Sequence, residues 1–191
     1  MVAVADGRRL RREQNREAVL DAMVSLFTEG ALQPTTDEIA ERAGVSARSL
    51  FRYFDDVEDL YRAAIERHLA AARPLLDLGV GPEAPLPVRV ERLVDARLRM
   101  YDAVGPAARA ARASAHRSPV VAGQLREARS FLRRQLRSLF APELAGRPAV
   151  LPAVDVLCSF ESYDLLRGDQ RMSRASAEAA LTAALMELLG P

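Results

Sequence analysis

The chain has 191 residues, a formal net charge of +1 and one cysteine, and all 27 of its basic residues are arginine. That length suits one large domain or a small domain joined to a larger one, and the near-neutral charge does not by itself mark a nucleic-acid-binding protein. A lone cysteine excludes an internal disulfide, and no segment resembles a membrane span of roughly 20 apolar residues or a signal peptide, so we expect a cytoplasmic protein.

The first predicted helix runs from about Arg11 to Glu29, and Gly30 follows where it should end. Its apolar residues recur three and four positions apart, as on the buried face of a helix: Val19, Ala22, Met23, Leu26 and Phe27. We expect residues 1–10 to form a flexible arm. Nearby arginines could reach phosphates or the minor groove, or could simply be solvated. They are Arg8, Arg9, Arg11, Arg12 and Arg16.

The stretch Thr35–Phe54 predicts two short helices joined by a tight turn. Thr35 and Glu38 have the spacing of a capping box at the start of the first helix. Its apolar face is formed by Ile39, Ala40 and Ala43. Gly44 suits a left-handed residue at the end of that helix, and Ser46 suits the N-cap of the next.

The second helix of this pair has two different faces. Leu50 and Phe54 lie four residues apart and are expected to point inward, whereas Arg48 and Arg52 share an outward face. An outward face with arginine suits the major groove of DNA, where guanidinium groups pair with guanine edges and phosphates. The alternative is an ordinary helical hairpin with a solvated, charged face.

The segments IAERAGVS, LFRYF and DDVEDLY resemble the DNA-binding domain of TetR-family transcriptional regulators, and the resemblance covers about Arg11 to Tyr61. It implies a DNA-binding helix-turn-helix in which Arg48 and Arg52 read bases and the remaining contacts go to phosphates. The expected DNA-binding residues are Thr35, Thr36, Ser46, Arg48, Ser49, Arg52 and Tyr53.

Two positions depart from the family pattern. The family usually has tyrosine where this chain has Phe51, and lysine where it has Val57. Both usual residues contact the DNA backbone, so we expect weaker phosphate anchoring from the core of the motif. The loss of one charged contact should flatten the salt dependence of binding by about one unit of slope.

The rest of the chain is also predicted to be helical, because no stretch shows the alternation of a β-strand. A helix from about Val57 to Arg73, with His68 at its surface or hinge, is followed by a break at Leu78–Pro87. The later predicted helices are Val88–Val104, Pro106–Ala115, Pro119–Phe140, Ala149–Leu166 and Ser173–Leu189. The predicted fold is all-α, with a three-helix DNA-binding domain at residues 1–55 and a larger ligand-binding and dimerisation domain at residues 56–191.

The last two predicted helices are apolar over most of their circumference, so each must bury two faces. In the final helix these residues are Ala177, Ala180, Leu181, Ala184, Leu185, Leu188 and Leu189. The family resemblance likewise implies a homodimer through the last two helices. A two-fold dimer presents two recognition helices, so we expect a palindromic operator in double-stranded DNA.

The resemblance further implies a small-molecule effector pocket within the C-terminal helices, and release of a repressor from DNA when it is filled. Candidate ligand-binding residues are the polar and aromatic side chains Arg97, Tyr101, Arg112, His116, Phe131, Gln135, Phe160, Tyr163 and Asp164. Arg97 and Arg112 would favour an anionic ligand. For each candidate, core packing or a surface position is a more common role than ligand contact.

We expect no catalytic activity, cofactor or metal, because the chain has none of the common catalytic, nucleotide-binding or zinc motifs. Cys158 is interpreted as a buried small hydrophobe. Glu161 and Asp164 lie three apart on a helix, but no histidine accompanies them. The competing hypothesis is a helical ligand-binding or oligomerisation module whose motif no longer binds DNA, and Phe51 and Val57 are its support.

Overall fold

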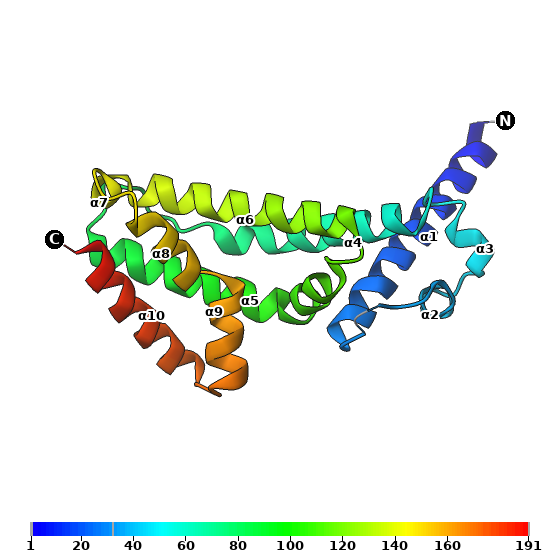
Figure 1. The fold of residues 1–191 in the computed structure, drawn as a ribbon. Helices are drawn as coiled ribbons and strands as arrows, with labels where there is room; N and C mark the ends of the chain where they lie inside the picture. The colour runs from blue at the N-terminus through cyan, green and yellow to red at the C-terminus, as the bar shows by residue number, and fades with distance from the viewer. Residues whose placement is uncertain (1, 32, 191) are drawn as a thin grey trace. The chain divides into compact units, whose positions relative to one another are not determined.

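The computed structural model describes residues 2–31 and 33–190, and every secondary-structure element within them is helical (Figure 1). The elements are α1 (Val2–Thr28), α2 (Thr36–Ala43), α3 (Ala47–Leu50), α4 (Val57–Ala72), η1 (Arg73–Leu76), α5 (Leu86–Ser114), α6 (Pro119–Leu139), α7 (Ala141–Leu144), α8 (Val150–Leu157), α9 (Phe160–Asp164), η2 (Leu165–Asp169) and α10 (Arg174–Leu189). The all-α fold predicted from the sequence is confirmed. No helix in the described ranges is long and apolar enough to cross a membrane.

The chain divides into two compact units. The first unit comprises Met1–Ala71 and Pro106–Arg126, and the second comprises Ala72–Gly105 and Glu127–Pro191. Helices α5 and α6 therefore contribute residues to both. The boundary near residue 56 was predicted on functional grounds, and it stays a prediction.

The first unit has a hydrophobic core built on α1. All five apolar residues predicted for the buried face of this helix are at most 9% exposed. Against them pack Ile39 and Ala40 of α2, and Leu50 and Phe54 from α3 and the turn after it. Burial of each large apolar side chain contributes about 1.5–3 kcal/mol relative to its exposed state. The core thus fixes α2 and α3 against α1.

Arg67 of α4 ties this helix to α1. Its guanidinium donates to the carboxylate of Glu17 at 2.7 Å and to that of Asp21 at 2.6 Å. His68, the next residue of α4, is half-buried, and burial lowers the pKa of its imidazole. The sequence placed His68 at the surface or hinge, and the structure places it on α4 with partial burial.

Helix α1 begins earlier than predicted. The expected flexible arm of residues 1–10 is helical from Val2 onward, and Met1 lies outside the described residues. Arginine has a good helix propensity, so the basic stretch extends the helix instead of ending it. The nearby arginines therefore stand on a helix and not on an arm. Gly30, with φ of 94°, ends the helical path as expected.

Pro106 does not separate two helices, although the sequence predicted a break there. It lies inside α5, which continues to Ser114. A proline in a helix costs roughly 3 kcal/mol through its missing N–H and its clash with the preceding turn. Val104 and Ala110 are buried on either side of it, and this burial offsets the cost.

The second unit has a break where one helix was predicted. The segment Ala149–Leu166 forms α8, then α9, then a π-helical turn. Ser159 causes the break, because its backbone is extended and its side chain accepts a hydrogen bond from the N–H of Ser162 at 3.2 Å. Helix α10 begins after the Ser173 cap, as predicted, and packs against α8 (Figure 1).

Candidate nucleic-acid interface

Helix α2 begins at a capping box. The hydroxyl of Thr35 accepts a hydrogen bond from the backbone N–H of Glu38 at 3.2 Å. In return the Glu38 carboxylate accepts from the backbone N–H of Thr35 at 2.7 Å and from its hydroxyl at 2.8 Å. These hydrogen bonds lower the pKa of the Glu38 carboxyl. The predicted start of the first helix is confirmed, and Thr35 is exposed to solvent.

The turn between α2 and α3 depends on Gly44. This residue has φ of 67° and ψ of 29°, a left-handed conformation that glycine adopts at little cost. The N–H of Val45 then donates to the carbonyl of Ala40 at 3.0 Å. Ser46 caps α3 by accepting from the N–H of Ser49 at 3.2 Å. The chain therefore reverses within three residues, as in a helix-turn-helix.

The regular α-helix of α3 is short, from Ala47 to Leu50, but its helical path continues to Phe54. The N–H of Arg52 donates to the carbonyl of Ser49 at 3.1 Å, and the N–H of Phe54 donates to that of Leu50 at 3.0 Å. This path buries Leu50 and Phe54 to 2% and 3% exposure, as expected from their spacing.

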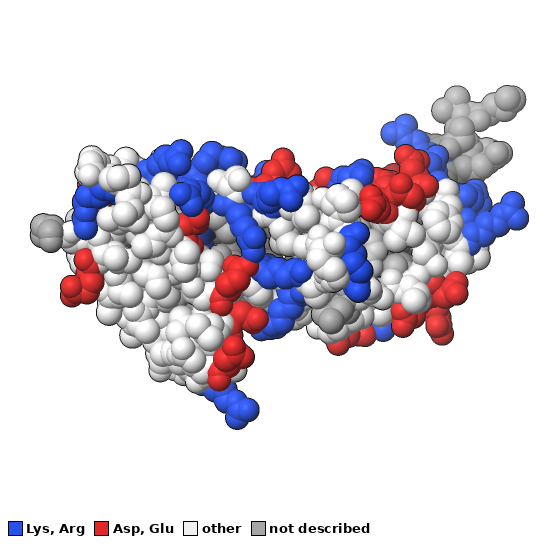
Figure 2. All heavy atoms as spheres, in the orientation of Figure 1, with Lys and Arg blue, Asp and Glu red and all other residues white. Residues whose placement is uncertain are grey.

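Arg48 and Arg52 lie on the opposite side, and both are exposed. Figure 2 shows basic side chains at the surface beside α3. Within the described parts of the chain, no ion pair or hydrogen bond occupies either guanidinium group. Both groups are therefore available to a partner. The absence of such partners among the described residues favours a binding surface over a solvated face stabilised by ion pairs.

Two contacts from α1 position this surface, and the sequence reasoning missed both. The amide of Asn15 donates to the hydroxyl of Tyr53 at 2.9 Å. The guanidinium of Arg12 donates to the backbone carbonyl of Arg52 at 3.1 Å. Each pair is distant in sequence, so no local pattern signals it. Together they hold the end of the α3 path against α1.

The other predicted contact residues surround the same helix pair. Thr36 is half-buried in the first turn of α2. The hydroxyls of Ser46 and Ser49 hydrogen-bond each other at 2.8 Å, and Tyr53 is half-buried against Asn15. Thus five of the seven predicted residues belong to α2, α3 or the turn after it, and Thr35 and Ser46 are the caps of α2 and α3.

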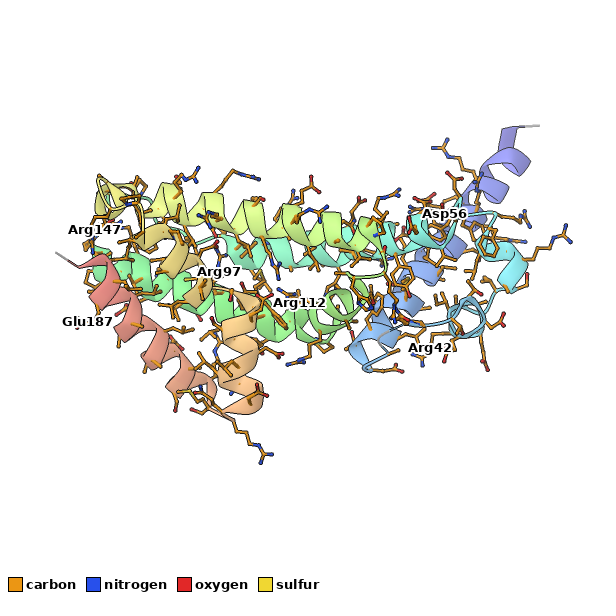
Figure 3. All side chains as sticks on the ribbon, viewed as in Figure 1. Arg42, Asp56, Arg97, Arg112, Arg147 and Glu187 are labelled. Atoms are coloured by element: carbon orange, nitrogen blue, oxygen red, sulfur yellow. The ribbon has the colours of Figure 1, made fainter. Side chains whose placement is uncertain are left out.

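Arg42 clamps α2 to the end of α1. Its guanidinium donates to both carboxylate oxygens of Glu29, at 2.5 and 2.8 Å, and to the hydroxyl of Ser25 at 3.0 Å (Figure 3). The hydrogen bonds from Arg42 and Ser25 lower the pKa of Glu29 to about 2. This bidentate pair links α2 to the residue that follows α1.

Phe51 and Val57 are among the exposed large apolar side chains. Phe51 is 53% exposed and Val57 is 36% exposed. Neither side chain is needed for the core of the first unit. Their exposure places apolar surface where the family pattern has a hydroxyl and an ammonium group.

Three of the candidate ligand-binding residues meet in the second unit. The rings of Tyr101, Phe160 and Tyr163 have centroids 5.5–5.7 Å apart. The hydroxyl of Tyr101 donates to the carbonyl of Cys158 at 2.8 Å, and that of Tyr163 donates to Asp102 at 2.7 Å. Helix α5 thus joins α9 through an aromatic cluster with satisfied hydroxyls.

The remaining candidates are dispersed. Arg112 and His116 belong to the first unit, and Arg112 donates to the carbonyl of Ala108 in its own helix at 3.2 Å. Phe131 is 42% exposed on α6, and Asp164 is half-buried at the end of α9. Gln135 is half-buried and donates to the carbonyl of Leu76 at 2.8 Å. The ligand-binding role of these residues stays a prediction.

Cys158 is buried, and burial raises the pKa of its thiol to about 12. Glu161, which lies three residues before Asp164 and was considered with it as a metal ligand, forms an ion pair with Arg129. In the described ranges no group of three or more His, Cys, Asp or Glu side chains is arranged to hold a metal ion.

Residues 19–64 match the family model of bacterial regulatory proteins, tetR family. A curated relative, the HTH-type transcriptional activator FasR of Mycolicibacterium smegmatis, is 39% identical over 64 residues. The match covers 33% of this chain and 29% of that protein, so the chain spans less than a third of its relative's length.

Solved structures extend the similarity to most of the chain. A tetR-family transcriptional regulator from Streptomyces coelicolor is 26% identical, with a TM-score of 0.72, over 92% of this chain and 80% of that one. A second structure, from Streptomyces coelicolor A3(2), has the same TM-score at 23% identity and covers 93% of this chain and 99% of the other, which shows a shared fold. Residues 19–64 thus match the DNA-binding segment of the tetR family, and most of the chain shares its helical fold with a solved tetR-family transcriptional regulator.

Proposed function

We propose that this regulator binds a specific DNA operator in the cytoplasm through Arg48 and Arg52. The observation that carries the proposal is the pair of exposed guanidinium groups on the outer face of the second helix of the motif, neither of them engaged by the described residues. Arginine pairs bidentately with the O6 and N7 acceptors of guanine in the major groove. Two arginines four residues apart on one helical path can read neighbouring base pairs.

Phosphate contacts would come from the residues around this pair. The exposed N-terminus of α2 at Thr35 offers backbone N–H groups and the positive end of a helix dipole. Ser46, Ser49 and Tyr53 add hydroxyl groups on the α3 side, and Thr36 adds one on α2. Such contacts fix register and orientation without reading sequence. They would seat α3 so that the arginines face the bases.

We further propose a homodimer through α8 and α10. The inner face of α10 buries Ala177, Leu181 and Leu185 within the unit. Its outer face carries exposed alanines at four-residue spacing, Ala175, Ala179 and Ala183, and the exposed residues of α8 include Val156 at 65% exposure. Small side chains let a second helix approach closely, so this surface suits the helix packing of a two-fold dimer.

A dimer would present two α3 helices to half-sites one helical turn apart or a multiple of it, so the operator should be palindromic. Residues 1–55 would form the reading head, and residues 56–191 the effector and dimerisation domain. An effector bound in the domain of residues 56–191 can weaken DNA binding only if it binds more tightly to a conformer of the protein that DNA disfavours. We propose that the protein represses transcription and that such an effector relieves the repression. Its relative FasR is named an activator, so activation is the alternative that a reporter assay must distinguish.

A second function is favoured by one observation. Exposed apolar side chains at Phe51 and Val57 would suit a helical module that binds ligands or partners and no longer binds DNA. Sequence-specific binding separates the two functions, because a vestigial motif would bind DNA weakly and without preference.

The experiment is a selection of genomic fragments with the purified full-length protein, followed by a reporter assay on the recovered site. We expect a palindromic site, and higher reporter expression when the regulator is deleted. Enrichment of unrelated fragments without a shared palindrome would reject operator binding. Lower expression on deletion would reverse the sign of regulation while operator binding stands.

A further inference from the structure

Arg97 is a charged side chain in the interior of the second unit. It lies on α5, among α6 and α8, and is 2% exposed (Figure 3). Its Nη2 donates to the carbonyl oxygen of Leu132 at 3.2 Å. Within residues 2–31 and 33–190, its Nε and Nη1 make no hydrogen bond. The N–H of Nε and both N–H groups of Nη1 are therefore buried without a partner.

This charge does not disappear by deprotonation. Burial lowers the pKa of the Arg97 guanidinium, but a guanidinium starts so high that it remains protonated at neutral pH. Asp155 is a carboxylate whose charge acts on the Arg97 guanidinium, but it already accepts a hydrogen bond from Arg133 at 2.8 Å. The neighbouring Cys158 is a neutral thiol. A buried cation with unused donors is costly to leave unpaired, so it indicates a missing anion.

We propose that Arg97 binds the carboxylate of a small-molecule effector. This inference rests on the effector response proposed above and gives that effector a chemical class. A carboxylate brings one negative charge and two acceptor oxygens, which complement the unused donors of a guanidinium. Arg112, the other arginine that the sequence singled out for an anionic ligand, is half-buried and belongs to the first unit.

A second unsatisfied group lies on α6, the helix whose Leu132 carbonyl accepts the hydrogen bond from Arg97. The Oε1 of Gln135 is buried without a partner among the described residues, while its Nε2 donates to the carbonyl of Leu76 at 2.8 Å. Gln135 follows Leu132 by three residues, so the two share one side of the helix. Its free oxygen can accept a hydrogen bond from a hydroxyl or N–H group on the ligand.

The rest of the ligand should be apolar. Tyr101 follows Arg97 by one helical turn on α5, and its ring packs with those of Phe160 and Tyr163. These rings touch one another, so a ligand must separate them. Helix α9 carries two of the three and is bounded by the Ser159 cap and the π-helical turn Leu165–Asp169. Such discontinuities favour movement of α9 as a short rigid piece.

The test uses matched pairs of compounds on the full-length protein. The probes are octanoate and 4-phenylbutyrate, each beside its neutral amide, with inorganic phosphate as an anion that lacks an apolar part. Thermal unfolding and calorimetric titration are measured for wild type, Arg97→Met, Arg97→Lys and the control Arg134→Met, at an exposed arginine of α6. We expect a carboxylate to raise the melting temperature saturably while its amide and phosphate do not. Arg97→Met should weaken carboxylate binding by about 30-fold or more, and Arg134→Met should leave it unchanged.

Without ligand, Arg97→Met should unfold at the same temperature as wild type or higher, because it removes a buried unpaired charge. Arg97→Lys keeps the charge without the planar fork and should bind the carboxylate with intermediate affinity, which preserves the test if Arg97→Met fails to fold. The proposal is overturned if no carboxylate stabilises wild type more than its amide does, or if the Arg97 variants respond as wild type does. The readout needs no DNA, so failure of operator binding in all variants would reject the proposed function and leave this site intact.

Discussion

The side-chain amide of Asn15 donates a 2.9 Å hydrogen bond to the hydroxyl oxygen of Tyr53, and so links α1 to the end of the α3 path. Because Asn15 supplies the donor, the hydroxyl proton of Tyr53 remains free to donate to another acceptor. In the proposed complex that acceptor is a DNA phosphate. Asn15 would then act through Tyr53 without touching DNA.

Loss of this link should weaken operator binding in a coupled way. We expect Tyr53→Phe to reduce affinity by up to about tenfold, the effect of one hydrogen bond. Asn15→Ala should cost less, and the double variant no more than Tyr53→Phe alone. A double-mutant cycle by fluorescence anisotropy measures the coupling. Strictly additive losses would show that the two residues act independently on DNA binding.

The Arg42–Glu29 pair should make stability depend on acid pH. The pKa of Glu29 is lowered from 4.5 to about 2 in the folded protein, so its contribution is fully present above about pH 4.5 and disappears as pH falls toward 2. We expect the difference in unfolding free energy between wild type and Arg42→Met to be constant above pH 4.5 and to shrink below it. Urea titrations across this range measure it. A difference that stays constant down to pH 2 would show that the pair does not stabilise the folded state.

Restoring a cation at position 57 should strengthen phosphate anchoring. Val57→Lys places an ammonium group where the side chain is 36% exposed, at the first residue of α4. One added phosphate contact steepens the plot of log affinity against log salt by about 0.9 units. Val88→Lys is the matched control, because Val88 is 38% exposed at the start of α5. Equal salt-dependence slopes for the two variants would show that position 57 does not contact DNA.

The proposed dimer predicts that charge on the outer face of α10 is disruptive. Ala179→Glu places a carboxylate in the exposed alanine stripe, where a two-fold interface would bury it opposite its own copy. We expect light scattering to report a dimer for wild type and a larger monomer fraction for Ala179→Glu. Ala70→Glu, at an exposed alanine inside α4, should remain dimeric. An unaffected Ala179→Glu dimer would place the interface elsewhere.

Local signals in the sequence were sufficient for the helix-turn-helix. Thr35 and Glu38 cap α2, Gly44 adopts the left-handed turn, and Ser46 caps α3, because each of these interactions spans only a few residues. Interactions across the fold were not predictable in this way. Pro106 stays helical because its neighbours on α5 are buried, which a rule based on proline alone misses.

The candidate site divides in the same manner. The outward direction of Arg48 and Arg52 follows from helical spacing, so both residues could be predicted from the sequence. Asn15 pairs with Tyr53 only because the core brings α1 beside α3, so no sequence spacing indicates it. The sequence likewise treated Arg97 and Arg112 alike, whereas tertiary packing buries only Arg97.

The central claim is that Arg48 and Arg52 read bases. It is tested most directly by titrating the recovered operator and a scrambled duplex at two salt concentrations with wild type, Arg48→Ala, Arg52→Ala and Arg134→Ala, an exposed arginine on α6. We predict that each motif variant loses about 1–3 kcal/mol of operator affinity and part of its preference over the scrambled duplex, while Arg134→Ala matches wild type. Equal binding of both duplexes by wild type, with no change in Arg48→Ala or Arg52→Ala, would contradict it.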